Sequence, residues 1–67
     1  MSVSVEEIGS GQWEARLSVA TPGGSRYFRE CGQNRTAALL ALSQSLARYQ
    51  GESYSDARAA VLEQARS

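Results

Sequence analysis

The first half of the chain alternates between apolar and polar side chains, which is the period of a strand with one buried face. Between residues 13 and 21 one parity is mainly apolar and the other is mainly polar. The apolar set is Trp13, Ala15, Leu17, Val19 and Thr21, and the polar set is Glu14, Arg16, Ser18 and Ala20. Residues two apart share a face of a sheet. We therefore expect a half-buried strand here.

A second strand is expected over residues 26–31, after the turn sequence Pro22-Gly23-Gly24-Ser25. Proline fixes one backbone angle of a tight reversal, and glycine accepts the positive φ that such a turn needs. We predict that Thr21 pairs with Arg26, which sets Val19 opposite Phe28 on the apolar face. The residues that share the polar face are then Arg16, Tyr27 and Arg29.

Glu30 does not fit this alternation, because the same register points it inward opposite Leu17. We expect the second strand to end, bulge or lie at an edge at that position. Residues 3–8 form the remaining strand, joined through the loop Gly9-Ser10-Gly11, in which Gly11 can take the left-handed bulge position. Pairing Val5 with Ala15 and Val3 with Leu17 turns both valines toward the core. A bulge at Glu6-Glu7 would keep Glu7 off the apolar face and Ile8 off the polar one.

After Gly32 the apolar period changes to that of a helix. Asn34 suits the N-cap, and Gly51 suits the left-handed position that ends a helix. The residues expected to face the sheet are Leu39, Leu42, Leu46 and Tyr49. A second helix begins near Ser53 and runs to about Arg66, with Tyr54, Ala57, Val61, Leu62 and Ala65 toward the core.

The sequence thus predicts a single α+β domain over residues 1–67. Its expected form is a three-stranded antiparallel meander packed by one long helix and followed by a second short helix, in the order β-β-β-α-α. The core is thin, because 10 of the 28 hydrophobic residues among 67 are alanine. A chain of this size buries only about 60% of its unfolded surface, so we expect a second copy or another molecule to share apolar surface. Ile8 and Leu40 lie outside the predicted core stripe and are candidates for such contacts.

Composition excludes several kinds of site. The chain has no histidine, and its one cysteine, Cys31, can form neither an internal disulfide nor a multi-cysteine zinc site. We expect Cys31 to be a half-buried residue at a strand end, and Glu6, Glu7 and Glu14 to be solubilising charges at a sheet edge. The two glycine pairs precede strands, so they are expected to form hairpin turns and not phosphate loops. We predict no catalytic residue, no cofactor, no metal and no enzymatic activity.

The most suggestive polar group is the predicted sheet face. Arginine and tyrosine on a sheet can grip an acidic protein surface, or bind phosphate and stack on a base. Equally, they can form a solvated face neutralised by cross-strand glutamates. The partner-binding candidates are Arg16, Tyr27 and Arg29, with Arg26 and Arg35 nearby. Seven arginines balance seven acidic residues, and a zero net charge does not favour nucleic-acid binding.

The junction Gly32-Gln33-Asn34-Arg35-Thr36-Ala37-Ala38-Leu39 resembles the strand–glycine–helix unit of HicB-like antitoxins, of double-stranded-RNA-binding domains and of the arm-binding domains of phage integrases. Spacings similar to the HicB-like pattern are found among Gly32, Ala38, Leu39, Leu46 and Tyr49. The resemblance covers residues 13–50 and rests on packing positions. The chain has neither the C-terminal DNA-binding segment of many such antitoxins nor the Lys-Lys pair of the RNA-binding domains. Of their ligand residues, the resemblance carries over only Arg35.

All basic residues of the chain are arginine, which suggests a GC-rich bacterial or phage genome. As a tiny, neutral, β-rich chain without an active site, it also looks in size and composition like small phage-encoded inhibitors such as anti-CRISPR proteins. We therefore expect a non-enzymatic protein-binding regulator or inhibitor that acts on host nucleic-acid-processing or defence machinery. Its expected place is the cytoplasm of a bacterial host, away from any membrane, as a monomer or a homodimer. The alternative is a small nucleic-acid-binding module that uses the arginine and tyrosine face.

Overall fold

The computed structural model describes residues 1–66, in which three strands are followed by two helices. The strands are β1 (Ser2–Gly9), β2 (Gln12–Thr21) and β3 (Gly24–Gly32), and the helices are α1 (Arg35–Gln50) and α2 (Tyr54–Ala65). The strands form an antiparallel sheet in the order β1-β2-β3. The predicted α+β class and the β-β-β-α-α order are confirmed.

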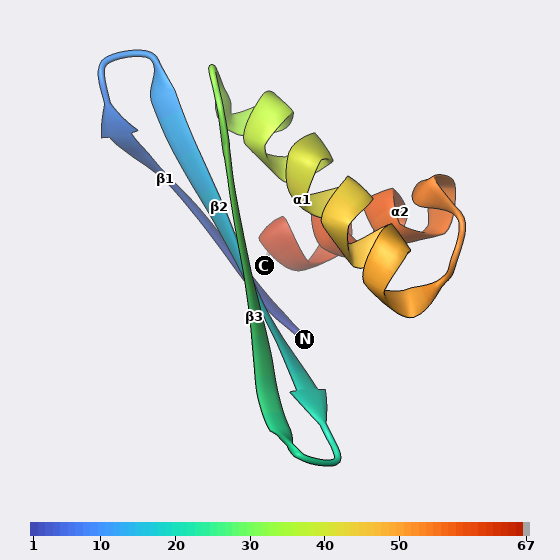
Figure 1. The fold of residues 1–67 in the computed structure, drawn as a ribbon. Helices are drawn as coiled ribbons and strands as arrows, with labels where there is room; N and C mark the ends of the chain where they lie inside the picture. Colours follow the sequence, from blue (N-terminus) through green and yellow to red (C-terminus); the bar gives the residue numbers. More distant parts are fainter. Residues whose placement is uncertain (67) are drawn as a thin grey trace.

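Both helices lie on the same side of the sheet, and the opposite side carries no layer of the described chain (Figure 1). α1 runs across β3 and β2, whereas α2 packs against α1 and reaches β1. We call the side away from the helices the outer face. A sheet of this kind buries one face and leaves the other to water, which is why its strands alternate apolar and polar residues.

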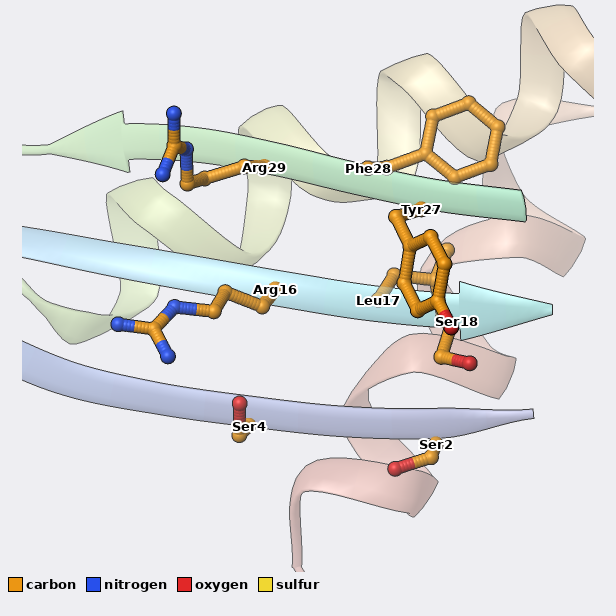
Figure 2. A pocket seen from close by; sticks show the side chains of 8 residues that line it. All are labelled: Ser2, Ser4, Arg16, Leu17, Ser18, Tyr27, Phe28 and Arg29. Carbon is orange, nitrogen blue, oxygen red and sulfur yellow. The ribbon is translucent and has the colours of Figure 1, made fainter. Parts of the chain in front are cut away.

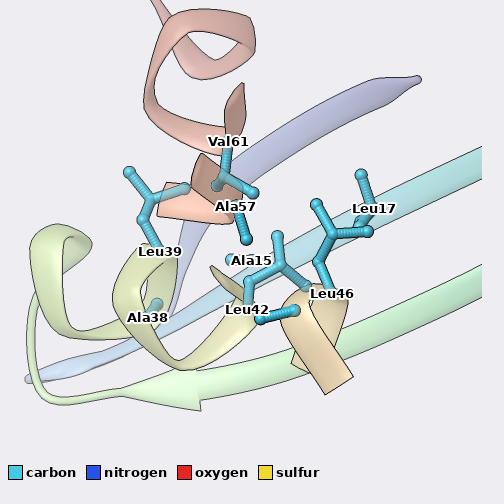
Figure 3. Close-up of a cluster of buried hydrophobic side chains, with 9 residues drawn as sticks. Ala15, Leu17, Ala38, Leu39, Leu42, Leu46, Ala57 and Val61 are labelled. Carbon is cyan, nitrogen blue, oxygen red and sulfur yellow. The ribbon is translucent and has the colours of Figure 1, made fainter. Parts of the chain in front are cut away.

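The core lies between the sheet and α1, as the leucine spacing predicts. Leu39, Leu42 and Leu46 of α1 are almost fully buried against Leu17 of β2 (Figure 3). Removing each of these side chains from water contributes about 1.5–3 kcal/mol. The other buried apolar residues are Ala15, Ala38, Ala47, Ala57 and Val61. Four alanines among nine buried apolar residues make this a thin core.

The register between β2 and β3 differs from the prediction by two positions. Thr21 pairs with Gly24 and not with Arg26, so that Leu17 lies opposite Phe28. The reversal uses only Pro22 and Gly23 between the paired residues, and the Thr21 hydroxyl donates to the Gly24 carbonyl at 2.9 Å. The prediction assumed a longer loop. A shift of two residues preserves which face each side chain occupies, so the predicted faces are correct although the pairing is wrong.

Glu30 points toward the helices, as predicted, but it pairs with Ala15. Its carboxylate accepts a hydrogen bond of 2.8 Å from the hydroxyl of Ser45 in α1. β3 is an edge strand and continues past Glu30 to Gly32. The inward carboxylate is therefore accommodated by a polar partner on the helix and not by a break in the strand.

The predicted pairs of β1 are confirmed: Val3 with Leu17 and Val5 with Ala15. Glu7 lies opposite Trp13, so it is not kept off the apolar face by a bulge. The irregularity lies between Glu7 and Gly9 and not at Glu6-Glu7. Ile8 falls at this irregularity and remains 49% exposed. Gly9 pairs with Gln12 across Ser10 and Gly11, and Gly11 has the expected left-handed φ of 70°.

The helix ends follow the predicted caps. The Asn34 side chain accepts from the Ala37 amide at 2.8 Å, and the Ser53 hydroxyl accepts from the Asp56 amide at 3.2 Å. Gly51 ends α1 with φ 68°, and its amide donates to the Ala47 carbonyl. Gly32, at the strand–helix junction, packs so closely that an added Cβ would lie 2.4 Å from the Ala38 nitrogen.

Candidate functional site

The outer face is built of cross-strand rows, because the register aligns one residue from each strand. The first row holds Glu6, Glu14 and Cys31; the second holds Ser4, Arg16 and Arg29; the third holds Ser2, Ser18 and Tyr27. An acidic row thus adjoins a basic row, which adjoins a row of hydroxyl-bearing side chains. Arg16, Tyr27 and Arg29, predicted from the sequence to share this face, are brought together on it.

Glu14 is the centre of the polar network on this face, and its side chain is only 11% exposed. One carboxylate oxygen accepts from Arg16 Nε at 2.5 Å, and the other lies 3.6 Å from Arg29 Nε. Arg16 Nη2 also donates to Glu6 on β1 at 2.5 Å. Arg16 is therefore held by two carboxylates, whereas Arg29 has one longer contact and a side chain that is 71% exposed.

These carboxylates also change the acidity of the Arg16 guanidinium. The hydrogen bond and the charge of Glu14, followed by the charge of Glu6, raise the pKa of Arg16 above its ordinary value. Neighbouring negative charges favour the protonated form. Arg16 is thus a permanent cation with a fixed direction, and its charge is largely compensated by side chains of its own sheet.

A shallow hollow of about 410 Å³ lies beside the two arginines (Figure 2). The side chains of Ser2, Ser4 and Ser18 line it together with Arg16, Arg29 and Tyr27. Three small side chains leave space next to a large ring, and Tyr27 is 75% exposed. Figure 2 shows the Tyr27 ring over Ser18 at one end, with the arginines at the other.

Two of the five predicted partner-binding residues lie elsewhere. Arg26 pairs with Val19, and its guanidinium lies 5.0 Å from the centre of the Tyr49 ring of α1. Arg35 donates to the Ala65 carbonyl at 3.2 Å, which links the start of α1 to the end of α2. Arg26 and Arg35 therefore do not join Arg16, Tyr27 and Arg29 on the outer face, since their side chains contact the helices.

The single tryptophan and the single cysteine of the chain also have defined positions. Trp13 is half-buried and packs against the core. Cys31 is exposed, contrary to the half-buried position expected for it, because β3 turns it onto the outer face opposite Glu14. Within residues 1–66, no three potential metal ligands gather in one place. Neither helix in that part of the chain is long and apolar enough to cross a membrane.

Sequence reasoning placed Ser18 on this face but missed Ser2 and Ser4, the serines that β1 contributes to the hollow. Ser4 pairs with Arg16, and Ser2 pairs with Ser18. The predicted pairing of Val3 with Leu17 already implied these neighbours, so the signal was present in the first strand. Neutralisation of the arginines by cross-strand glutamates was one of the two alternatives from the sequence, and Glu6 and Glu14 provide it. The convergence of both carboxylates on Arg16 was not predicted, since it depends on side-chain geometry that the strand pattern does not specify.

Comparison with known proteins yields no relative: no family model, no curated protein and no solved structure matches this chain.

Proposed function

We propose that this protein is a non-enzymatic regulator that binds another protein through its outer face. One observation carries the proposal: an uncovered sheet face presents the exposed Tyr27 and Arg29 around a hollow of about 410 Å³. Tyrosine and arginine are enriched among the few residues that dominate binding energy at protein interfaces. Occupying a partner's surface in this way would alter that partner's activity without chemistry of its own.

The way the anchors are held supports this proposal. Tyr27 and Arg29 stand on a strand of a hydrogen-bonded sheet, so their backbone positions are fixed before a partner arrives. A rigid binding surface loses less conformational entropy on association than a loop does. The Arg29 guanidinium can still bind an acidic group of a partner, because its one ionic neighbour in the described residues lies 3.6 Å away. An acidic side chain on the partner would complement it, and the hollow would accept a neighbouring side chain.

Charge on the outer face favours a protein partner over nucleic acid. Arg16 and Arg29 share the face with Glu6 and Glu14, so two positive charges meet two negative ones. Binding to a phosphate backbone depends on basic side chains that neutralise phosphates. Here the carboxylates already compensate the arginines. We keep a host nucleic-acid-processing or defence protein as the expected class of target.

The experiment compares three variants as bait in a lysate of the source organism. Tyr27→Ala and Arg29→Glu change the outer face, whereas Arg58→Glu makes the same charge change as Arg29→Glu on α2, which lies on the other side of the sheet (Figure 1). We expect one protein to be captured by the original chain and by Arg58→Glu, with at least about tenfold less bound by either outer-face variant. Equal capture by all four baits would contradict the proposal.

Nucleic-acid binding is tested in the same series. Fluorescence anisotropy at low salt, with duplex and single-stranded DNA and RNA, detects the electrostatic binding expected of such a module. We expect no binding. Affinity that falls steeply with salt and is lost in Arg29→Glu would replace the proposal with the nucleic-acid alternative.

A further inference from the structure

The outer edge of β1 is unprotected over the first half of the strand, whereas the second half carries Glu6, Glu7 and the irregularity before Gly9. β1 pairs with β2 on one side, and no described strand lies on its other side. Its first four residues, Ser2–Val5, contain no charge, no proline and no glycine. Soluble proteins usually protect exposed edges with charges, prolines or bulges, because the unpaired backbone groups of an edge recruit another strand.

The other edge is better protected. β3 carries Arg26, Arg29 and Glu30, and α1 packs over this strand. Arg26 lies over Tyr49, and Glu30 accepts a hydrogen bond from Ser45, so both side chains bind the chain's own helix. Val3 and Val5 of β1 contact the helical side only through apolar packing. The two edges therefore differ in how readily they can accept a strand.

Apolar cover is also incomplete along β1. Val3 and Val5 pack against the core but remain half-buried. α2 approaches the strands with its C-terminal end, while its first turns lie away from them (Figure 1). A strand added beside β1 would bring apolar side chains against these valines. In a protein with so few large buried side chains, that extra burial is a substantial addition.

We propose that two copies of this chain pair antiparallel through β1, with Ser4 opposite Ser4 on the two-fold axis. This register sets Val3 opposite Val5 twice and keeps both pairs on the helix side. It also sets Ser2 opposite Glu6, so no like charges meet. The product is a six-stranded sheet with all four helices on one side, held by an isologous contact.

Other symmetric registers are poorer. A centre at Val5 sets Val3 against the carboxylate of Glu7, and a centre at Glu6 sets two carboxylates directly opposite each other. A centre at Val3 shortens the overlap within the strand. A shift by one residue would place valines of one copy on the serine side of the other. The composition of β1 thus selects Ser4 as the centre.

Pairing through β1 also has a consequence for the outer face. Ser2 and Ser4 line the hollow on its β1 side, so the two hollows of a dimer lie next to each other across the new strand pair. The dimer contact uses the strand edge and needs no partner protein. It therefore stands whether or not the proposed function is correct, and its test contains only this chain.

Sedimentation equilibrium tests the pairing. We expect the original chain to show a concentration-dependent mass that approaches twice that of one chain. Ser4→Glu places two carboxylates across the axis and Ser4→Lys places two ammonium groups there. Each should raise the dimer dissociation constant by at least about fivefold. Ser25→Glu introduces the same charge on the outer face of β3 and should leave the dimer intact.

A mixture of the Ser4→Glu and Ser4→Lys chains should recover the dimer, because opposite charges then meet on the axis. This recovery distinguishes lost pairing from lost folding. A mass of one chain at every concentration for the original protein would overturn the proposal. So would a dimer that Ser4→Glu leaves unchanged, which would point to the β3 edge.

Disulfide trapping tests the register. Residues directly opposite in an antiparallel pair have Cα atoms about 4.5–5.5 Å apart, within reach of a disulfide. We expect Ser4→Cys, made together with Cys31→Ser, to form a covalent dimer under mild oxidation. Ser25→Cys in the same background is the matched control and should stay monomeric on a denaturing gel. Equal trapping of both would overturn the Ser4-centred register.

Discussion

Arg16 and Arg29 lie directly opposite each other on β2 and β3, a position in which two like charges destabilise a sheet. The carboxylate of Glu14 compensates this repulsion, since it lies 2.5 Å from one Nε and 3.6 Å from the other. Its side chain is 11% exposed, so water screens it less than the arginines it binds. One glutamate thus allows two guanidinium groups to stand side by side on the outer face.

Replacing this carboxylate should therefore destabilise the fold. We expect Glu14→Gln to lower the free energy of unfolding by about 1–2 kcal/mol, because Arg29 then loses its ionic neighbour and Arg16 keeps only the exposed Glu6. Glu6→Gln is the matched control. Its side chain is 58% exposed, and an exposed ion pair contributes less than about 1 kcal/mol. Urea denaturation measures both variants, and equal losses would show that Glu14 has no special role.

A second prediction concerns the junction between β3 and α1. A Cβ on Gly32 would lie 2.4 Å from the Ala38 nitrogen and 2.8 Å from the Ala37 carbonyl carbon. Backbone atoms cannot move aside as a flexible side chain can, so Gly32→Ala must displace the start of α1. We expect a loss of about 2 kcal/mol or more.

Gly23→Ala is the control for that experiment, because nothing lies within 4 Å of its added Cβ and its φ is not positive. Its effect should be within about 0.5 kcal/mol. Thermal unfolding followed by circular dichroism measures both. If the two glycine variants melt at the same temperature, the close approach of strand and helix at Gly32 is incorrect.

Much of the fold could be predicted because apolar periodicity and capping residues act locally. Neighbours within a few positions determine the alternation of β2, the N-caps Asn34 and Ser53, and the glycine that ends α1. The β2–β3 pairing could not be obtained in this way. A two-residue and a four-residue connection put the same side chains on the same faces, so hydrophobic pattern alone does not distinguish them.

The same limit applies to the candidate site. Alternation places Arg16, Tyr27 and Arg29 on one face, and the structure agrees. Arg26 has the other parity and lies over Tyr49, near the end of the helix α1 that packs on β3. Parity already separated Arg26 from the outer face, but its aromatic partner depends on how α1 crosses the sheet. Arg35, similarly, has its partner in α2, thirty positions along the chain.

A third prediction tests the two faces of β3 directly. Tyr27 is 75% exposed on the outer face, whereas its neighbour Phe28 is half-buried, with its ring centre 5.2 Å from that of Tyr49. Tyr27→Ala should change the free energy of unfolding by less than about 0.5 kcal/mol. Phe28→Ala should cost about 2 kcal/mol or more, since it removes a ring packed on the core. Chemical denaturation of the two variants gives the comparison, and the reverse order of losses would mean that the faces are exchanged.

The last prediction follows from the raised pKa of Arg16. A basic group whose pKa is higher in the folded state contributes stability that is complete below its unfolded pKa and disappears only as pH rises through its folded pKa. For arginine both values lie far above neutrality. Glu14 and Glu6 raise the folded value further, so the contribution of Arg16 should be constant between about pH 6 and pH 9. Urea unfolding of the original chain and of Arg16→Gln should be measured across that range. The difference between their free energies of unfolding gives the contribution of Arg16, because the titration of other groups is common to both chains and cancels. The difference should not change with pH. A difference that shrinks as pH rises within this range would mean that the stabilising group is not the Arg16 cation held by the two carboxylates.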